Sequence, residues 1–131
     1  MKAFAYVIAQ TPESAVELVR NQGRFLAGGI DLLGELKEHL AEPKTVVNVK
    51  MLPQTQEIAP AGDTWGIGAN VTLAALAAHP DLRRVFPGVA EAAAEVGSPQ
   101  MRNVATVGGN LAQHSRCWYY RHRDIRCLKK G

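Results

Sequence analysis

Aromatic residues and long apolar runs are scarce in this chain, and each shortage excludes a class of protein. Aromatic side chains make up only 6% of the 131 residues, while glycine and alanine are abundant. This composition favours a compact α/β or α+β fold over an aromatic-rich sandwich. No apolar run reaches the roughly 18 residues that span a bilayer, and the N-terminus lacks the apolar core of a signal peptide. We therefore expect a cytoplasmic protein with no membrane segment, unless the export signal of a partner carries a complex to the periplasm.

Residues that carry out acid–base or nucleophilic chemistry are also sparse. Residues 1–115 hold no cluster of histidine, cysteine and carboxylates at metal-ligand spacing, no serine in a nucleophile elbow and no prominent carboxylate pair. His39 and His79 stand alone near the ends of predicted helices, where a solvated or capping histidine is the common case. We therefore predict no catalytic side chain here.

Charge is distributed unevenly along the chain. Residues 1–115 carry nine Lys or Arg against eleven Asp or Glu, whereas residues 116–131 carry six Lys or Arg against Asp124 alone. Both cysteines, Cys117 and Cys127, also lie in this basic C-terminal segment. The segment is therefore a different kind of sequence from the body of the chain.

The body is predicted to form short alternating elements in two lobes, which makes an α+β fold. Thr11 and Pro12 supply the N-cap and the first-position proline of the first helix, which Gly23 is expected to end. The N-terminal α/β lobe, residues 1–53, has strands over 2–9, 24–27 and 45–49 and a second helix over 31–40. The second lobe, residues 54–115, has a hairpin over 57–59 and 64–69 and helices over 73–79, 81–86 and 89–96.

Two glycine pairs, Gly28-Gly29 and Gly108-Gly109, lie 80 residues apart, each after residues predicted to be extended. Adjacent glycines permit sharp turns and positive φ, so successive backbone N–H groups can converge on one anion. We predict that the pairs form two sides of one anion site. Asp31, after the first pair, is either a helix N-cap or a ligand contact. Arg102-Asn103, before the second pair, is either part of this site or a surface arginine and a turn asparagine.

Three segments resemble a known family. They read FLAGGIDLL (25–33), IGANVTL (67–73) and GSPQMRNVATVGGNL (97–111). In this order and spacing they resemble the FAD-binding medium subunit of the molybdenum hydroxylases, the family of xanthine dehydrogenase, aldehyde oxidoreductase and carbon monoxide dehydrogenase. The resemblance covers nearly the whole chain.

The resemblance implies a two-lobed module with FAD stretched between the lobes. The first glycine turn would embrace the pyrophosphate, and the second would contribute from the opposite lobe. Ile30 departs from the threonine common in the family, which removes one hydroxyl donor. Carried over by position, the cofactor-binding residues would be Leu26, Ala27, Gly28, Gly29, Ile30, Asp31, Arg102, Asn103, Thr106, Gly109 and Asn110.

Residues 110–121, which read NLAQHSRCWYYR, resemble the branch of the family that includes 4-hydroxybenzoyl-CoA reductase, whose medium subunit carries an extra [4Fe-4S] cluster. By this resemblance Cys117 and Cys127 would be the first two of four cysteine ligands, since thiolates hold such clusters. Without the family, free or incidental thiols explain the two cysteines better. Family medium subunits are considerably longer, so we expect the second lobe to be incomplete and the chain to be truncated at its C-terminus.

The implied function is electron transfer. A large partner subunit with molybdopterin would oxidise the substrate, and electrons would pass through the [2Fe-2S] clusters of a small subunit to FAD in this chain and on to an external acceptor. The chain's own task would be to hold and tune the flavin.

Two other classes of function stay open. The chain could be a non-catalytic assembly module without flavin. The least favoured class is a nucleic-acid binder that stacks bases on Trp118, Tyr119 and Tyr120 of the basic segment, because this class leaves both glycine pairs without a role.

Overall fold

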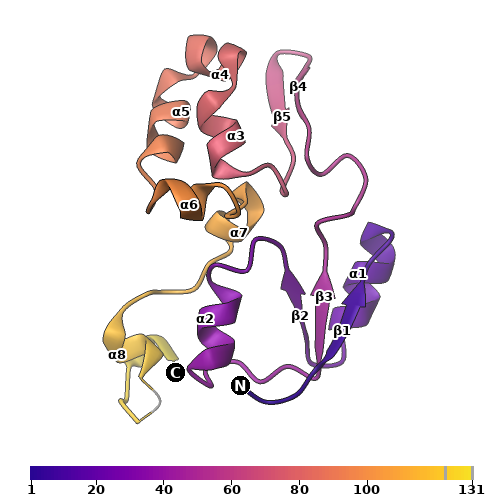
Figure 1. Ribbon diagram of the computed structural model, residues 1–131, viewed down its shortest axis with the longest axis vertical. Coiled ribbons are helices and arrows are strands. Elements are labelled where there is room, and N and C mark those ends of the chain that lie inside the picture. The colour runs from indigo at the N-terminus through magenta and orange to yellow at the C-terminus, as the bar shows by residue number, and fades with distance from the viewer. Residues whose placement is uncertain (123, 131) are drawn as a thin grey trace.

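Three short parallel strands form the centre of the N-terminal lobe in the computed structural model, which describes residues 1–122 and 124–130. They are β1 (Ala5–Ile8), β2 (Gly23–Leu26) and β3 (Thr45–Asn48), side by side in the order β1-β3-β2 (Figure 1). The central strand, β3, is a run of buried residues. Such a run is typical of a parallel sheet that is covered on both faces.

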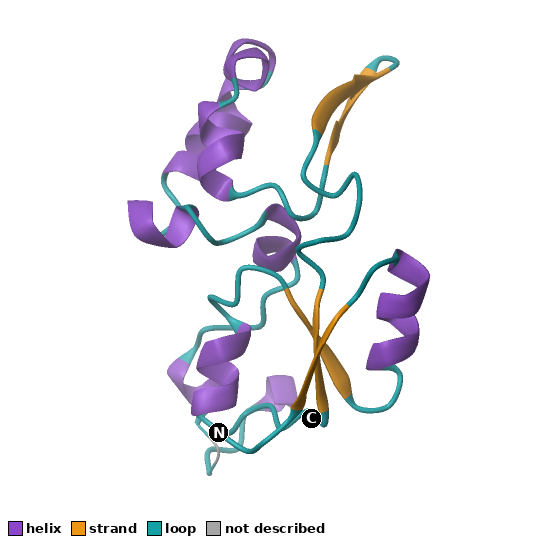
Figure 2. Ribbon diagram, turned by 45° about the vertical axis from the view of Figure 1, so that its right-hand side comes forward, coloured by secondary structure: helices purple, strands orange, loops and turns teal. Residues whose placement is uncertain are grey.

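One helix covers each face of this sheet. The helices are α1 (Pro12–Val19) and α2 (Leu32–Lys37). Val47 lies in a buried cluster with Ala15 of α1, and its strand neighbour Val46 lies in another with Leu36 of α2. Because successive strand side chains point to opposite faces, the two helices lie on opposite sides of the sheet (Figure 2). The connections after β1 and β2 therefore diverge, and open α/β sheets bind ligands in the crevice between such connections.

The beginning of α1 is as predicted, but its end is not. Thr11 Oγ1 accepts the N–H of Ser14 at 3.2 Å, and Pro12 is the first helical residue. The helix ends at Val19, before Gly23, because Gln22 adopts a φ of 60° and turns the chain into β2. Gly23 is accordingly the first residue of the strand.

The second lobe packs a hairpin against three helices, as Figure 1 shows. The hairpin joins β4 (Ile58–Ala61) to β5 (Thr64–Ile67), and the helices are α3 (Leu73–Ala78), α4 (Pro80–Val85) and α5 (Pro87–Ala94). Their core contains Val71, Leu76, Leu82 and Ala93. The three predicted helices are confirmed, although α4 and α5 begin at their prolines, because proline suits the first helical position.

Short helical segments after α5 were not predicted. They are α6 (Pro99–Arg102), α7 (Val107–Leu111), α8 (Trp118–Arg121) and a 3₁₀ turn (Leu128–Lys130). Ser98 and Thr106 cap α6 and α7 with their hydroxyl groups. Each segment is about one turn long, which is too short to show a helical apolar period. The predicted α+β class is confirmed.

In the part of the chain that the structure describes, every helix is too short or too polar to span a bilayer.

Candidate functional site

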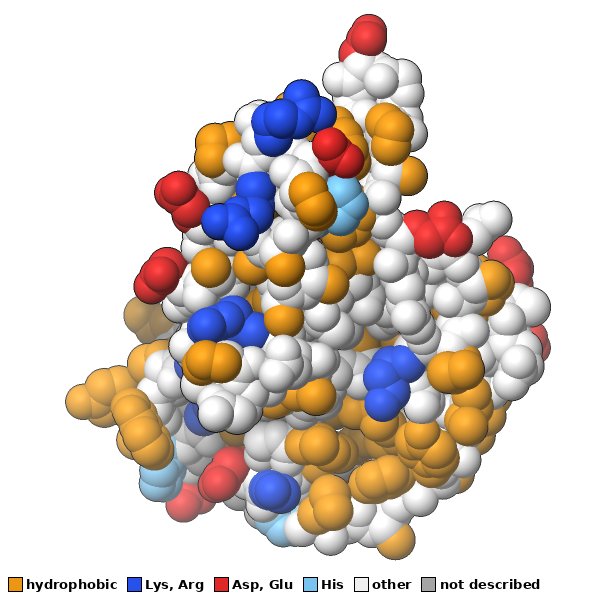
Figure 3. Space-filling view, turned by 45° about the horizontal axis from the view of Figure 1, so that its top comes forward, with side chains coloured by type: hydrophobic (Ala, Val, Ile, Leu, Met, Phe, Trp, Pro, Cys, Tyr) orange, Lys and Arg blue, Asp and Glu red, His pale blue; other side chains and the backbone are white. Residues whose placement is uncertain are grey.

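A cleft of about 900 Å³ opens between the two lobes. Its walls come from α1, from β2 and the loop that follows it, and from residues 96–116. Hydrophobic side chains gather on the N-terminal lobe (Figure 3), and those that line the cleft include Val16, Phe25 and Leu52. A cleft of this size between two lobes, with an apolar wall, is a common setting for a cofactor.

The first glycine pair lies where the chain leaves β2 and turns toward α2. Gly29 has a φ of +78°, a conformation that favours glycine. Gly28 instead allows a close approach: a Cβ at this position would lie 1.9 Å from the carbonyl oxygen of Val104 in the second lobe. The predicted turn is confirmed, and its two glycines have different roles. Gly29 turns the backbone, and Gly28 lets the lobes touch.

The amide groups of this turn are not used by the described part of the protein. Within the described residues, the backbone N–H groups of Gly28, Gly29, Ile30 and Asp31 donate to no protein acceptor. The N–H of Leu33 is the next that is engaged, and it bonds to the Gly29 carbonyl at 3.0 Å. Successive unpaired amides on a glycine turn form a concave site for an anion.

The second glycine pair is not a turn, and the prediction of an N–H nest there is wrong. Gly108 and Gly109 lie in the first turn of α7. The Gly108 N–H donates to the carbonyl of Ala69 at 2.8 Å, and the Gly109 N–H donates to Thr106 Oγ1 at 3.2 Å. Because Thr106 caps a helix here, the protein itself uses the amides that a turn would have left free.

Most of the predicted cofactor-binding residues line the cleft. Leu26 does not: it packs with Leu36 and Val46 in the core beneath α2. Asn103 does not either: it is the C-cap residue of α6, and it is exposed to solvent. The nine that do line the cleft are Ala27, Gly28, Gly29, Ile30, Asp31, Arg102, Thr106, Gly109 and Asn110. Their part in binding a cofactor stays a prediction.

Two arginines bring positive charge to the cleft wall. Arg102 donates through Nη1 to the carbonyls of Val96, at 3.0 Å, and Gly97, at 3.2 Å. It thereby fixes the loop between α5 and α6, and its charge stays at the cleft. Arg24 also lines the cleft, and its side chain has no partner among the described residues. These guanidinium groups are not paired with a carboxylate in the described part of the chain, so they favour an anionic ligand.

Asp31 does not cap α2 with its side chain. Its carboxylate accepts hydrogen bonds from Arg121 and from the backbone N–H of His114, the latter at 3.1 Å, and lies 3.6 Å from Arg116. Burial disfavours the charged form, but the two hydrogen bonds and the neighbouring arginine charges outweigh it and hold the pKa of Asp31 below its usual value. Asp31 therefore joins the N-terminal lobe to residues far along the chain.

The lowered pKa of Asp31 predicts how its contact with His114 depends on pH. A carboxyl with a lower pKa in the folded state stabilises that state above its unfolded value of about 3.9, and this contribution is lost as the pH falls through the folded pKa. The part of the change in the His114 amide proton signal that comes from Asp31 should therefore occur below about pH 3.9. Asp31→Asn should remove this titration, and a midpoint above the usual aspartate value would contradict the account.

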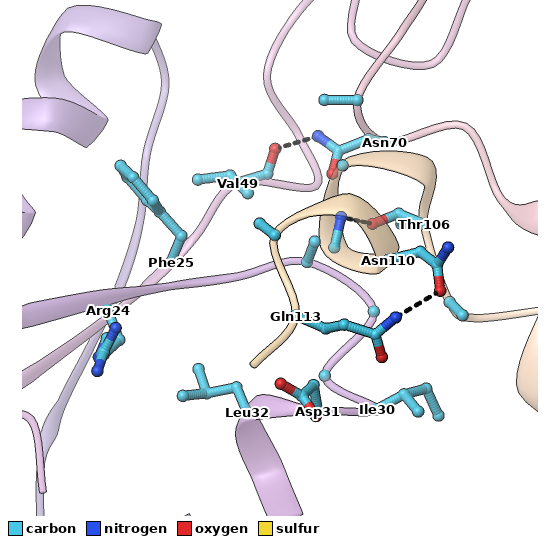
Figure 4. Close-up of a pocket in the computed structure, with 18 of the residues that line it drawn as sticks. Arg24, Phe25, Ile30, Asp31, Leu32, Val49, Asn70, Thr106, Asn110 and Gln113 are labelled. Carbon is cyan, nitrogen blue, oxygen red and sulfur yellow. Dashed lines mark hydrogen bonds between the residues drawn. The ribbon is translucent and has the colours of Figure 1, made fainter. Parts of the chain in front are cut away.

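Asn70, which the sequence did not single out as a site residue, joins the two lobes. Its side chain is buried and donates through Nδ2 to the carbonyl of Val49 at 2.7 Å and to Thr55 Oγ1 at 2.9 Å. The bond to Val49 is drawn in Figure 4. An amide side chain within the largely apolar segment IGANVTL was the available signal, because a buried polar side chain requires partners.

Cys117 is exposed and Cys127 is partly exposed, and both are free thiols. Over the described residues, no group of three or more His, Cys, Asp or Glu side chains could hold a metal ion. The two cysteines supply half of a four-cysteine site, so the [4Fe-4S] cluster stays a prediction from resemblance.

Known proteins match both the sequence and the fold. The model of the FAD-binding domain in molybdopterin dehydrogenase matches residues 2–120. The aldehyde oxidoreductase FAD-binding subunit PaoB of Escherichia coli (strain K12) is 38% identical, over 99% of this chain and 42% of that protein. The nicotinate dehydrogenase FAD-subunit of Eubacterium barkeri is 34% identical, over 88% of this chain and 40% of that protein.

A solved structure agrees with these relatives. Quinoline 2-oxidoreductase from Pseudomonas putida 86 superposes with a TM-score of 0.80 and 28% identity, over 86% of this chain and 41% of that one. The chain thus spans about two fifths of the length of the proteins that it matches.

Proposed function

Because this chain belongs to the family of FAD-binding domains in molybdopterin dehydrogenases, we propose that its interlobe cleft holds FAD, with the diphosphate beside the first glycine turn. The observation that carries this proposal is the run of unpaired amides from Gly28 to Asp31. Backbone N–H groups bind phosphate oxygens without any charged side chain. The loss of a threonine hydroxyl at Ile30 leaves this backbone site intact.

The surroundings of the turn fit the parts of a dinucleotide. Arg24 and Arg102 bring positive charge to the wall. Two carboxylates also line it: Asp31 pairs with Arg121, and Glu35 lies 2.8 Å from the His114 ring. The net field therefore suits a diphosphate. The apolar wall that contains Phe25 suits a flat ring system.

Bound FAD supplies the electron-transfer chemistry, and the residues of this chain bind and orient it. We infer no acid, base or nucleophile, because among the described residues no serine or cysteine lines the cleft and its one lining histidine is paired within the protein. The His114 ring is engaged by Glu35 at 2.8 Å. The role of the chain is thus that of a cofactor-holding part of an oxidoreductase.

The longer protein of which such a domain is part would act in a complex. Its relatives are named as FAD-binding subunits and as the medium chains of carbon monoxide dehydrogenases. By analogy, FAD held here would pass electrons between the [2Fe-2S] clusters of a small subunit and an external acceptor, after a molybdopterin-binding large subunit has oxidised the substrate.

Binding of FAD by the purified chain tests the proposal. We expect FAD fluorescence to be quenched on binding, ADP to compete, and riboflavin, which lacks the diphosphate, to bind at least roughly tenfold more weakly. At a hundredfold excess of FAD over its Kd, the free energy of unfolding should rise by about 2.7 kcal/mol.

A colourless protein that gains no thermal stability from FAD would contradict this proposal and favour the assembly module without flavin. Single-stranded oligonucleotides serve as the control ligand. Tight binding to them that weakens steeply with salt would favour nucleic-acid recognition by the basic segment instead.

A further inference from the structure

The chain that follows α7 lies along the cleft and is hydrogen-bonded to α2 of the N-terminal lobe. We call residues 112–121 the clasp segment. Four of its residues line the cleft: Ala112, Gln113, His114 and Arg116. From this position the segment makes hydrogen bonds to the N-terminal lobe and to α7, so it forms one side of the proposed FAD site.

Two carboxylates hold the clasp segment to the N-terminal lobe. Asp31 and Glu35 are four residues apart at the start of α2 and so share a helix face. Asp31 accepts the His114 N–H and a guanidinium hydrogen of Arg121, and Glu35 Oε1 lies 2.8 Å from Nδ1 of His114. Glu35 is only 6% exposed, and a carboxylate so buried requires such a partner.

Local side-chain hydrogen bonds link the clasp segment to α7, the helix that precedes it. Gln113 Nε2 donates to Asn110 Oδ1 of α7 at 3.1 Å, as Figure 4 shows. Arg116 Nε donates in turn to Gln113 Oε1 at 3.1 Å. Arg116 thus lies between the Gln113 side chain and the Asp31 carboxylate. The distance from Arg116 Nη2 to Asp31 Oδ1 is 3.6 Å.

The position of Asp31 raises an electrostatic problem that Arg121 solves. Asp31 is the residue after Ile30, so its carboxylate belongs to the same turn as the unpaired amides. An unneutralised carboxylate there would repel a diphosphate. Arg121 is 80% buried at its side chain and is fixed by a second bond, from Nε to the Ser115 carbonyl at 2.9 Å. The Arg121 charge is therefore held in place beside Asp31. The Arg116 side chain is half exposed, so water screens its charge more strongly.

We propose that Arg121 is a positioning residue of the FAD site, which it serves by neutralising Asp31 beside the phosphate-binding turn. This inference rests on the proposed function, because it concerns binding at the same cleft. The C-terminal segment would thus neutralise a carboxylate that the glycine turn itself brings to the site. Arg121 acts through Asp31 and does not need to contact the cofactor.

A charge cycle on the full chain tests the inference, with FAD affinity measured by fluorescence quenching. Arg121→Gln should raise the Kd for FAD by roughly five- to tenfold, because it exposes the Asp31 charge. The double variant Asp31→Asn with Arg121→Gln should return the Kd to within about twofold of the wild-type value. Arg126→Gln is the matched control, since Arg126 lies in the same basic segment, is exposed and has no partner among the described residues.

Two outcomes would overturn the inference: a wild-type Kd for Arg121→Gln, or a double variant that binds as weakly as Arg121→Gln. Hydrogen exchange of residues 112–121 without flavin separates this failure from failure of the proposed function. Faster exchange in Arg121→Gln but not in Arg126→Gln supports the contact between Arg121 and Asp31. Equal exchange in both variants overturns this contact and the inference that depends on it. Absence of FAD binding by the wild-type chain would instead overturn the proposed function and, with it, the electrostatic role of Arg121.

Discussion

Gly28→Ala is expected to reduce FAD affinity at least roughly hundredfold and to lower the free energy of unfolding by about 1–3 kcal/mol. The added Cβ would lie 1.9 Å from the Val104 carbonyl oxygen, a distance that forces the backbone of one lobe to move. The unpaired amides begin at this same residue, so any shift that relieves the clash also displaces them from the bound phosphate.

Gly88→Ala provides the matched control for this substitution. A Cβ at Gly88 meets no atom within 4 Å, and the residue lies in the first turn of α5. This variant should bind FAD as the wild type does and be at least as stable, because alanine favours a helix. Equal FAD affinity for Gly28→Ala and Gly88→Ala, measured by fluorescence titration, would show that the close approach of the lobes does not position the site.

Leu82→Ala is expected to destabilise the chain by about 2–5 kcal/mol. Leu82 has no exposed surface and lies in the core of the second lobe with Val71 and Leu76. Truncation leaves a cavity between α3, α4 and α5, and this lobe supplies the Val104 side of the interlobe contact. Urea unfolding followed by circular dichroism measures the loss, and FAD affinity should fall as the second lobe unfolds.

Val85→Ala is the control on the same helix, because Val85 is 43% exposed and the removal of its methyl groups leaves no buried cavity. We expect a change of less than about 1 kcal/mol. If Leu82→Ala and Val85→Ala were equally stable, the second lobe would lack the packed core described above.

Local patterns predicted the N-terminal lobe well, because each element there carries its own signals. The Thr11-Pro12 start of α1, the buried strand at β3 and the turn at Gly28-Gly29 are all confirmed. The second glycine pair was misread because adjacent glycines indicate a turn, whereas Thr106 caps a helix there. The sequence shows both possibilities, and only tertiary contacts such as that between Gly108 and Ala69 decide between them.

The parts of the site that were missed depend on contacts between distant residues. The pairing of Asp31 with Arg121 joins positions 90 apart, and the bond from Asn70 to Val49 joins positions 21 apart. No local pattern encodes such partners, so Asp31 could be read only as an N-cap or a ligand contact. Leu26 and Asn103 were assigned to the site by position from the family resemblance, but the Leu26 side chain packs in the core and Asn103 is exposed.

The central claim is that the first glycine turn, through its free amides, binds the diphosphate of FAD. The most direct measurement is a titration of ¹⁵N-labelled protein with ADP, which contains the diphosphate but no flavin ring. We expect large shifts and slower exchange for the amides of Gly28, Gly29 and Ile30. The amides of Gly108 and Gly109, already bonded within the protein, should shift much less. Large shifts at the second pair, with none at the first, would contradict the account.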